Sequence, residues 1–162
     1  MRLAADEMLC GLGRWLRAAG HDTLIAEPGE GDTRLLARSR AEGRVLLTRD
    51  RALAERAGSD GVRLRAVGLD EAARELRDRL GLEWCLAPFT RCLVDNAELA
   101  EAGSDAPGAV PPRARLLGGP LRRCPACGRL YWPGGHVRRM RARLDAWAAP
   151  AAGRDARGCT QK

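Results

Sequence analysis

The first eighty residues alternate strand-like segments with segments of helical spacing, and this alternation is the strongest constraint on the fold. RVLLT (44–48) is the clearest buried strand of the chain. DTRLLARSRAEG (32–43) is typical of the helices, because it starts at an aspartate and ends at a glycine. Four strand–helix units in a row predict an α/β fold, with a parallel sheet that carries helices on both faces. The predicted strands are residues 2–5, 21–26, 44–48 and 62–67, and the predicted helices are residues 8–20, 32–43, 50–58 and 70–81.

The character of the sequence changes after residue 82. A stretch rich in Ala, Gly and Pro leads to a pair of cysteines, and HVRRMRARLDAW (136–147) predicts a closing basic helix. The last residues show no apolar pattern, so we expect them to be frayed. We therefore predict an α/β domain over residues 1–82, a small cysteine-containing module over residues 83–147 and a disordered tail over residues 148–162.

The charge balance bears on the partner of this chain. Its 162 residues include 28 Lys and Arg against 21 Asp and Glu, a net charge of +7. A basic protein favours an anionic partner, nucleic acid first, although Lys162 is the only lysine and a general preference for arginine is the competing interpretation. No apolar run could cross a bilayer, and MRLAADEML carries acidic residues where a secretory signal has its apolar core. We expect a cytoplasmic protein with no membrane partner.

Four aspartates follow the carboxyl ends of the predicted strands. In an open parallel sheet, ligands bind outside this edge, so the fold would gather the four carboxylates there. A hard cation such as Mg²⁺ or Mn²⁺ would relieve their repulsion and could activate a water. The alternative is helix capping, because aspartate is a preferred N-cap and each of these residues starts a predicted helix. The four are Asp6, Asp32, Asp50 and Asp70.

Position distinguishes these aspartates. Asp70 looks most like a pure cap, because DEAARELRDRL is an ordinary charged amphipathic helix. Asp50 looks least like a cap, since it closely follows the buried strand in LLTRD. Asp6 ends the first strand, which is normally central in such folds, so Asp6 and Asp50 should form the innermost pair. Asp22 lies at the opposite, entering end of its strand, and we predict a structural role for it.

An ordered series of motifs runs along almost the whole chain. ADEMLCGLGRWLRAAGHDTL, DTRLL and GRVLLTRDRALAERA are followed by FTRCLVDN, VPPR and RCPACGRLYWPGGHVRRM. Over roughly residues 1–147, this series resembles the PIN-like ribonuclease domain of the Mut-seven C-terminal family. The resemblance implies a PIN-like α/β fold, a C-terminal zinc ribbon and metal-dependent cleavage of RNA.

The resemblance also implies an active site. Its acidic residues fall on Asp6, Asp32 and Asp50, which are three of the four aspartates at the strand ends. Bound Mg²⁺ or Mn²⁺ would activate water for in-line attack on an RNA phosphodiester. Three arginines are candidates for holding the RNA phosphates, with surface charge as the alternative interpretation: Arg14, Arg17 and Arg49.

Cys124 and Cys127, with two residues between them, have the spacing of one half of a zinc site. The resemblance implies that CLVDN, which starts at Cys92, is the other half, although the family pattern has a second cysteine where this chain has Asp95. Structural zinc is nearly always four-coordinate and accepts carboxylate ligands, so Asp95 could be the fourth ligand. The resemblance favours Asp95 over its rival His136, because the family has a histidine at that position alongside its four cysteines. The alternative is that the metal has been lost and apolar residues hold the ribbon together.

A closed zinc site would be structural, because it has no open position for a substrate. The ribbon could extend an RNA-binding surface, since Tyr131, Trp132 and the basic helix HVRRMRAR (136–143) offer stacking and phosphate contacts. Packing of Tyr131 and Trp132 within the ribbon is the alternative. Our first hypothesis is a metal-dependent ribonuclease, the second is a non-catalytic RNA-binding protein, and the third is a protein-interaction adaptor whose basic surface is incidental.

Overall fold

The computed structural model of the chain describes residues 1–103, 110–112, 116 and 119–149. The predicted tail (148–162) lies almost entirely outside the described residues. Within the described part of the chain, no helix has both the length and the apolar character needed to cross a membrane.

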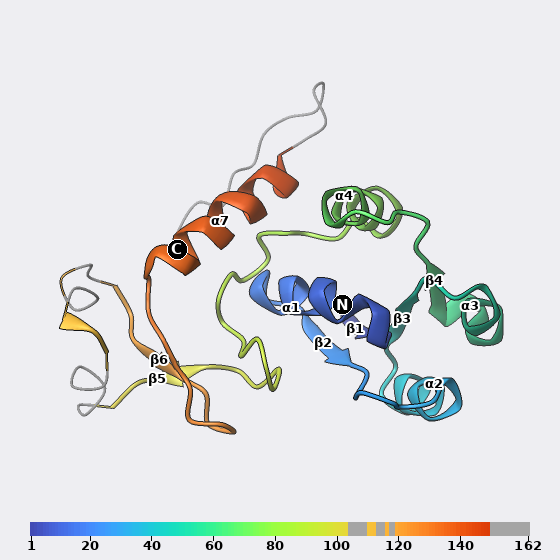
Figure 1. The fold of residues 1–162 in the computed structure, drawn as a ribbon, viewed down its shortest axis with the longest axis horizontal. Coiled ribbons are helices and arrows are strands. Elements are labelled where there is room, and N and C mark those ends of the chain that lie inside the picture. Colours follow the sequence, from blue (N-terminus) through green and yellow to red (C-terminus); the bar gives the residue numbers. More distant parts are fainter. Residues whose placement is uncertain (104–109, 113–115, 117–118, 150–162) are drawn as a thin grey trace.

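Four parallel strands form the main sheet, in the order β2-β1-β3-β4. The first strand is therefore central, and the predicted parallel sheet is confirmed (Figure 1). The register places Leu46 of the third strand opposite Ala4 of the first strand, and Leu47 opposite Ala5. The strands are β1 (Arg2–Ala5), β2 (Asp22–Ile25), β3 (Val45–Thr48) and β4 (Gly61–Arg63).

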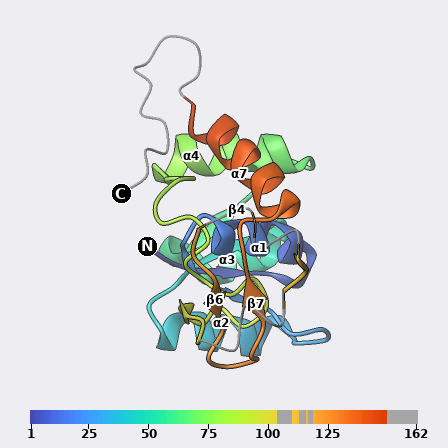
Figure 2. The same cartoon turned by 90° about the vertical axis from the view of Figure 1, so that its left-hand side faces the viewer.

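Helices cover both faces of the sheet, because successive strand residues point to opposite faces and both sets are apolar. Ala4 and Leu46 pack against α2 and α3, whereas Ala5 and Leu47 pack in a second core with α1 and α4. Figures 1 and 2 show these two layers of helices. The helices are α1 (Cys10–Ala18), α2 (Asp32–Ala41), α3 (Arg51–Ala57) and α4 (Leu69–Leu80), with short 3-10 turns η1 (Glu7–Leu9) and η2 (Gly58–Asp60).

The fourth strand is shorter than the predicted strand over residues 62–67, because it ends at Arg63. The N–H of Leu64 still donates to the carbonyl oxygen of Thr48 on β3 at 2.8 Å, but the next two backbone N–H groups bond to a side chain instead of a neighbouring strand. The carboxylate of Glu75 on α4 accepts hydrogen bonds from the N–H of Arg65 and of Ala66, each at 3.0 Å. This contact draws the chain away from the sheet toward α4.

The closing helix α7 (Gly135–Ala148) packs on the α/β core, beside α4 (Figure 2). Leu144 is fully buried, and Trp147 is only 5 % exposed. The ring of Trp147 makes edge-on contacts with Trp15 of α1 at 4.8 Å and with Trp84 at 4.7 Å between ring centroids. Aromatic contacts of this kind add to the burial energy, so α7 shares one core with α1 and α4.

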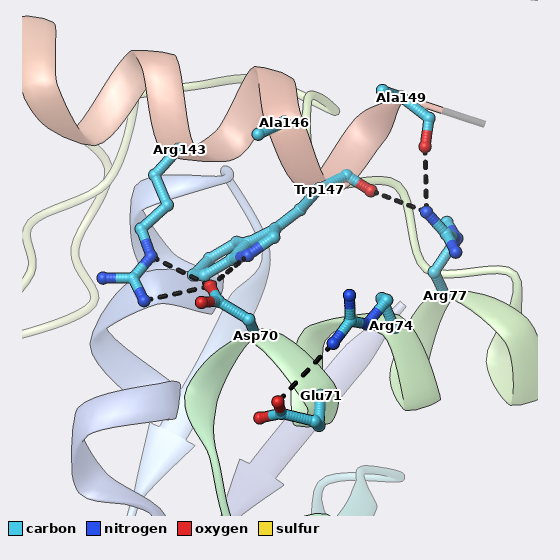
Figure 3. A pocket seen from close by; sticks show the side chains of 8 residues that line it. All are labelled: Asp70, Glu71, Arg74, Arg77, Arg143, Ala146, Trp147 and Ala149. Atoms are coloured by element: carbon cyan, nitrogen blue, oxygen red, sulfur yellow. Dashed lines mark hydrogen bonds and ion pairs between the residues drawn. The ribbon is translucent and has the colours of Figure 1, made fainter. Parts of the chain in front are cut away.

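The prediction that Asp70 caps its helix is wrong. The helix begins one residue earlier than Asp70, at Leu69, with Gly68 as the N-cap. The Oδ1 of Asp70 accepts hydrogen bonds from Arg143 at 2.9 Å and from the indole Nε1 of Trp147 at 2.8 Å (Figure 3). Both donors lie on α7, so Asp70 joins α4 to α7.

A second, antiparallel sheet forms the small C-terminal ribbon. Its strands are β5 (Ala100–Glu101), β6 (Arg122–Arg123) and β7 (Leu130–Tyr131), in the order β5-β6-β7. A separate small core holds this ribbon together around the buried side chains of Cys92, Leu99 and Cys124.

Candidate functional site

Asp6 and Asp50 follow the two central strands of the main sheet, β1 and β3, at their carboxyl ends. Thr48, the last residue of β3, connects them. Its hydroxyl group donates a hydrogen bond to Oδ2 of Asp6 at 2.6 Å. The hydroxyl oxygen of Thr48 in turn accepts a hydrogen bond from the backbone N–H of Asp50 at 2.9 Å. Thr48 therefore positions both aspartates. We did not predict this role from the sequence, although Thr48 stands in the LLTRD motif.

Both aspartates are also helix caps. Oδ1 of Asp6 accepts the N–H of Glu7 at 2.7 Å, and Oδ1 of Asp50 accepts the N–H of Leu53 at 2.7 Å. A carboxylate has two oxygens, so capping and a role at the sheet edge are compatible. In the described part of the chain, the second oxygen of Asp50 has no hydrogen-bond partner.

Asp32 is the first residue of α2 and is half exposed. Its Oδ2 lies 3.6 Å from the guanidinium of Arg56 on α3. Asp6, Asp32 and Asp50 do not converge within the reach of a single ion. Among the described residues, only the cysteine cluster brings three or more possible metal-ligand atoms within 4.8 Å of one another.

The three candidate phosphate-binding arginines differ in their surroundings. Arg14 is exposed on α1. Arg17 is only 6 % exposed, and its guanidinium donates to the carbonyl oxygens of Thr23, Leu93 and Val94. Burial and these contacts assign Arg17 a structural role instead of the predicted phosphate contact.

Arg49 is partly buried beside Asp50. Its guanidinium donates to the carbonyl oxygen of Ala66 at 3.0 Å and to that of Val67 at 2.6 Å. These bonds fix the segment that follows β4. Of the three arginines, Arg14 therefore has the side chain that is most accessible to a ligand.

The cysteine cluster has the geometry of a metal site. It contains Cys92, Asp95, Cys124 and Cys127, whereas the rival ligand His136 lies outside it. A tetrahedral zinc site with ordinary bond lengths has neighbouring sulfur atoms about 3.8 Å apart and sulfur–oxygen distances of about 3.5 Å.

The observed distances agree with these values. Sγ of Cys92 lies 3.9 Å from Sγ of Cys127, and Oδ2 of Asp95 lies 3.3 Å from Sγ of Cys92 and 3.4 Å from Sγ of Cys124. Three sulfur ligands and one carboxylate oxygen therefore fit a tetrahedral ion, and this cluster could hold a metal.

Hydrogen bonds shift the pKa values of two thiols in this cluster in opposite directions. Burial raises the pKa of the Cys92 thiol, but hydrogen bonds from the Tyr131 hydroxyl and from the N–H of Asp95 and Val94 outweigh burial and lower that pKa below its usual value. The hydrogen bond to Asp95 raises the pKa of Cys127 to about 12. An ion would displace the Cys127 proton, because thiolates are the ligating form.

Tyr131 therefore serves the ribbon itself. Its hydroxyl lies 3.1 Å from Sγ of Cys92 and accepts the N–H of Leu93 at 3.1 Å. This arrangement favours the packing interpretation of Tyr131 over base stacking.

The turn that carries Cys92 and Asp95 is fastened to the main sheet. The side chain of Asn96 accepts the N–H of Thr23 on β2 at 2.9 Å and donates to Asp22 at 2.6 Å. Asp22 also pairs with Arg44 at 2.8 Å, which confirms its predicted structural role. The metal-ligand turn is thus held directly against the edge strand β2.

Comparison with known proteins agrees with this architecture. The family described as Mut7-C RNAse domain matches residues 1–144, which is most of the chain. No curated protein and no solved structure gives a significant match. The family description points to a nuclease-like function. A parallel α/β sheet, a cysteine ribbon and a match over 144 residues lead to one conclusion: this chain belongs to the Mut7-C RNAse domain family.

Proposed function

We propose that this protein is a metal-dependent ribonuclease in which Asp6, Asp32 and Asp50 hold Mg²⁺ or Mn²⁺. One observation carries the proposal: Asp6 and Asp50 follow the two central parallel strands and share the hydrogen bonds of Thr48. Ligands of open parallel sheets bind at this edge. The description of the family supports RNA as the substrate.

The donor set suits the proposed ion. Mg²⁺ prefers carboxylate oxygens and keeps several of its waters, so one or two direct carboxylate contacts suffice. Asp32 and Asp50 are exposed, and Asp6 is held in place by Thr48. When bound, the ion would supply an activated water and neutralise charge on the phosphodiester.

The chain's own residues would orient these groups and the RNA. Thr48 fixes the carboxylate of Asp6, and the bond to the N–H of Leu53 fixes that of Asp50. Arg14, exposed on α1, is our candidate for a phosphate contact. We also expect the protein to act in the cytoplasm, on RNA.

We further propose that the cluster of Cys92, Asp95, Cys124 and Cys127 binds Zn²⁺ as a structural ion. The sulfur–sulfur and sulfur–oxygen distances support this identity, as does the soft character of the three thiolates. With four protein ligands the site would be closed, so its function would be to hold the ribbon together.

One observation favours a second function, a non-catalytic RNA-binding protein. The three carboxylates do not converge in the described structure, and both Asp6 and Asp50 serve as helix caps. A chain that has kept these aspartates only for folding would bind RNA without cleaving it.

Cleavage of end-labelled single-stranded RNA separates the two functions. The assay compares the wild type with Asp50→Asn and with the matched control Asp60→Asn. Asparagine caps a helix as well as aspartate does, so Asp50→Asn removes the charge but keeps the fold. Asp60 is an exposed aspartate that precedes β4, at the opposite edge of the sheet. Divalent ions should be left out of the buffer and not removed with a chelator, because a chelator would also remove a Zn²⁺ ion bound to the cysteine cluster.

We expect cleavage that requires Mg²⁺ or Mn²⁺, is unchanged in Asp60→Asn and falls about tenfold or more in Asp50→Asn. Equal cleavage by all three proteins would refute the assigned site. Absence of cleavage together with salt-dependent RNA binding would establish the second function. Absence of RNA binding even at low salt would leave the adaptor hypothesis.

A further inference from the structure

The positive charge of this protein is concentrated in one segment. Residues 106–144 contain nine arginines and no lysine, aspartate or glutamate. The other 123 residues contain 19 of the 28 basic residues and all 21 acidic ones, so they carry a small negative charge. The net charge of +7 therefore comes from this segment alone, which includes β6, β7 and most of α7.

Arginines of the α/β part are largely neutralised by carboxylates. Arg38 pairs with Glu30 at 2.7 Å, and Arg79 pairs with Glu75 at 2.6 Å. Five arginines of the C-terminal segment differ: within the residues that the structure describes, their guanidinium groups have no ion pair and no hydrogen bond. These five are Arg122 on β6, Arg129 just before β7, and Arg138, Arg139 and Arg141 on α7.

Three of these arginines, Arg122, Arg138 and Arg141, line the same groove, which has a volume of about 940 Å³ and lies between the ribbon and α7. Figure 2 shows the ribbon strands leading up into α7. Aromatic side chains of Phe89 and Trp132 line the groove with them. Asp145 is the only acidic residue among the described residues of its lining.

The indole of Trp132 lies close to the backbone at Gly134. A Cβ atom at Gly134 would lie 2.8 Å from the indole Nε1 of Trp132, so only glycine leaves room for the ring there. The indole is partly exposed. A partly exposed aromatic side chain beside unpaired arginines is the combination that single-stranded nucleic acids bind.

We propose that this groove binds single-stranded RNA. Arg122, Arg138 and Arg141 contact successive phosphates, and the face of Trp132 stacks on an unpaired base. Bases of a duplex are already stacked on one another, so the groove selects single strands. The identity of the nucleic acid as RNA rests on the proposed function, whereas the binding site rests on the groove and its charge.

Fluorescence anisotropy with a short fluorescein-labelled oligouridine tests the site. The protein is the full chain with Asp50→Asn, and divalent ions are omitted, so that cleavage of the probe is suppressed. Arg138→Ala and Arg141→Ala are compared with Arg139→Ala. Arg139 is an exposed arginine of the same helix that does not line the groove. Alanine favours helix, so all three variants should fold, and circular dichroism checks this.

Each lost phosphate contact should make the slope of log affinity against log salt concentration less steep by about 0.7. At about 0.1 M salt, this change corresponds to an affinity about fivefold lower than that of the parent protein. We expect this loss in Arg138→Ala and in Arg141→Ala, and a clearly smaller loss in Arg139→Ala. Trp132→Leu should weaken binding about fivefold or more without a change in salt slope. A duplex of the same length should bind more weakly than the single strand.

Equal losses in Arg139→Ala and in the two groove variants would overturn the proposal, because charge alone would then explain binding. Wild-type affinity in both groove variants would also overturn it. The outcome is separable from that of the proposed function. Cleavage without a groove effect refutes only this site, and groove binding without cleavage refutes only the nuclease.

Discussion

Replacing Arg17 with methionine should destabilise the whole chain, whereas the same change at Arg14 should not. Both arginines lie on α1 and precede the same strand. The guanidinium of Arg17 donates to the carbonyl oxygens of Thr23 at 2.8 Å and Leu93 at 3.1 Å, with a third bond to Val94. Methionine keeps most of the apolar stem but leaves these carbonyl oxygens without their donor.

The size of the effect follows from the three bonds. A hydrogen bond from a charged group contributes about 1.5–3 kcal/mol net, and buried acceptors left unpaired add a cost. Desolvation offsets part of this, since burial lowers the pKa of Arg17 to about 10. We therefore expect a loss of about 3–5 kcal/mol in the free energy of unfolding for Arg17→Met, because three carbonyl oxygens lose a charged donor. For a chain of 162 residues this is a decrease in melting temperature on the order of 10 °C.

Scanning calorimetry and an RNA-binding assay together check this prediction. Arg17→Met should melt early but, at a temperature where it is folded, bind RNA as the wild type does. Arg14→Met should melt within about 2 °C of the wild type and lose about fivefold in RNA affinity, as for one lost phosphate contact. A wild-type melting temperature for Arg17→Met would refute the structural role of Arg17.

Three further predictions concern α7, Asp22 and the metal cluster. Trp147→Ala should cost about 3–5 kcal/mol and lower a single melting transition, since Trp147 shares the core of α1 and α4; two separate calorimetric transitions would contradict this. Burial raises the pKa of the Asp22 carboxyl, but hydrogen bonds from Arg44, Asn96 and Arg2 outweigh burial and hold that pKa below its ordinary 3.8. The stabilisation by Asp22 is therefore present above pH 3.8 and lost as the pH falls further, so urea midpoints of Asp22→Asn should fall less than those of the wild type between about pH 5 and about pH 2. Asp95→Cys should raise the affinity for Zn²⁺ in a chelator competition, because a fourth soft thiolate replaces a carboxylate, and an unchanged affinity would argue against Asp95 as a ligand.

Local patterns were enough to predict most of the fold. Alternation of apolar strands and capped helices predicted the parallel sheet, and the position of Asp22 at the entering end of its strand predicted its structural role. The end of the fourth strand could not be predicted, because the bond from the N–H of Ala66 goes to Glu75, a side chain of the next helix. Residues 62–67 are apolar enough to look like one continuous strand.

Arg17 shows why the candidate site was harder to predict. In a chain rich in arginine, one more arginine looks like surface charge. Its partners are backbone carbonyl oxygens, and two of them lie more than seventy residues away. Every residue has a backbone carbonyl oxygen, so the sequence does not show which of them accepts a hydrogen bond from Arg17. Asp70 was misassigned for a related reason, because its donors lie on α7, at the far end of the chain.

The aspartates show a different limit. Capping and a role at the sheet edge were treated as alternatives, but Asp50 caps α3 through one oxygen and keeps the other free of hydrogen bonds in the described structure. The sequence can place such a residue at a strand end. It cannot show that the hydroxyl of Thr48 connects Asp50 to Asp6, since that contact depends on the pairing of β1 and β3.

The departure from the family pattern at Asp95 should affect the metal site more than the docking of the ribbon. The turn from Cys92 to Asn96 contacts the sheet through its neighbours: the carbonyl oxygens of Leu93 and Val94 accept from α1, and the side chain of Asn96 bonds to β2. Asn96 adopts a left-handed conformation, with φ of 66°, which asparagine tolerates better than most residues. No bond between the turn and the sheet involves the side chain of residue 95 in the described part of the chain. Exchange of cysteine for aspartate at this position therefore changes the ligand without moving the turn, which explains how the chain can tolerate it.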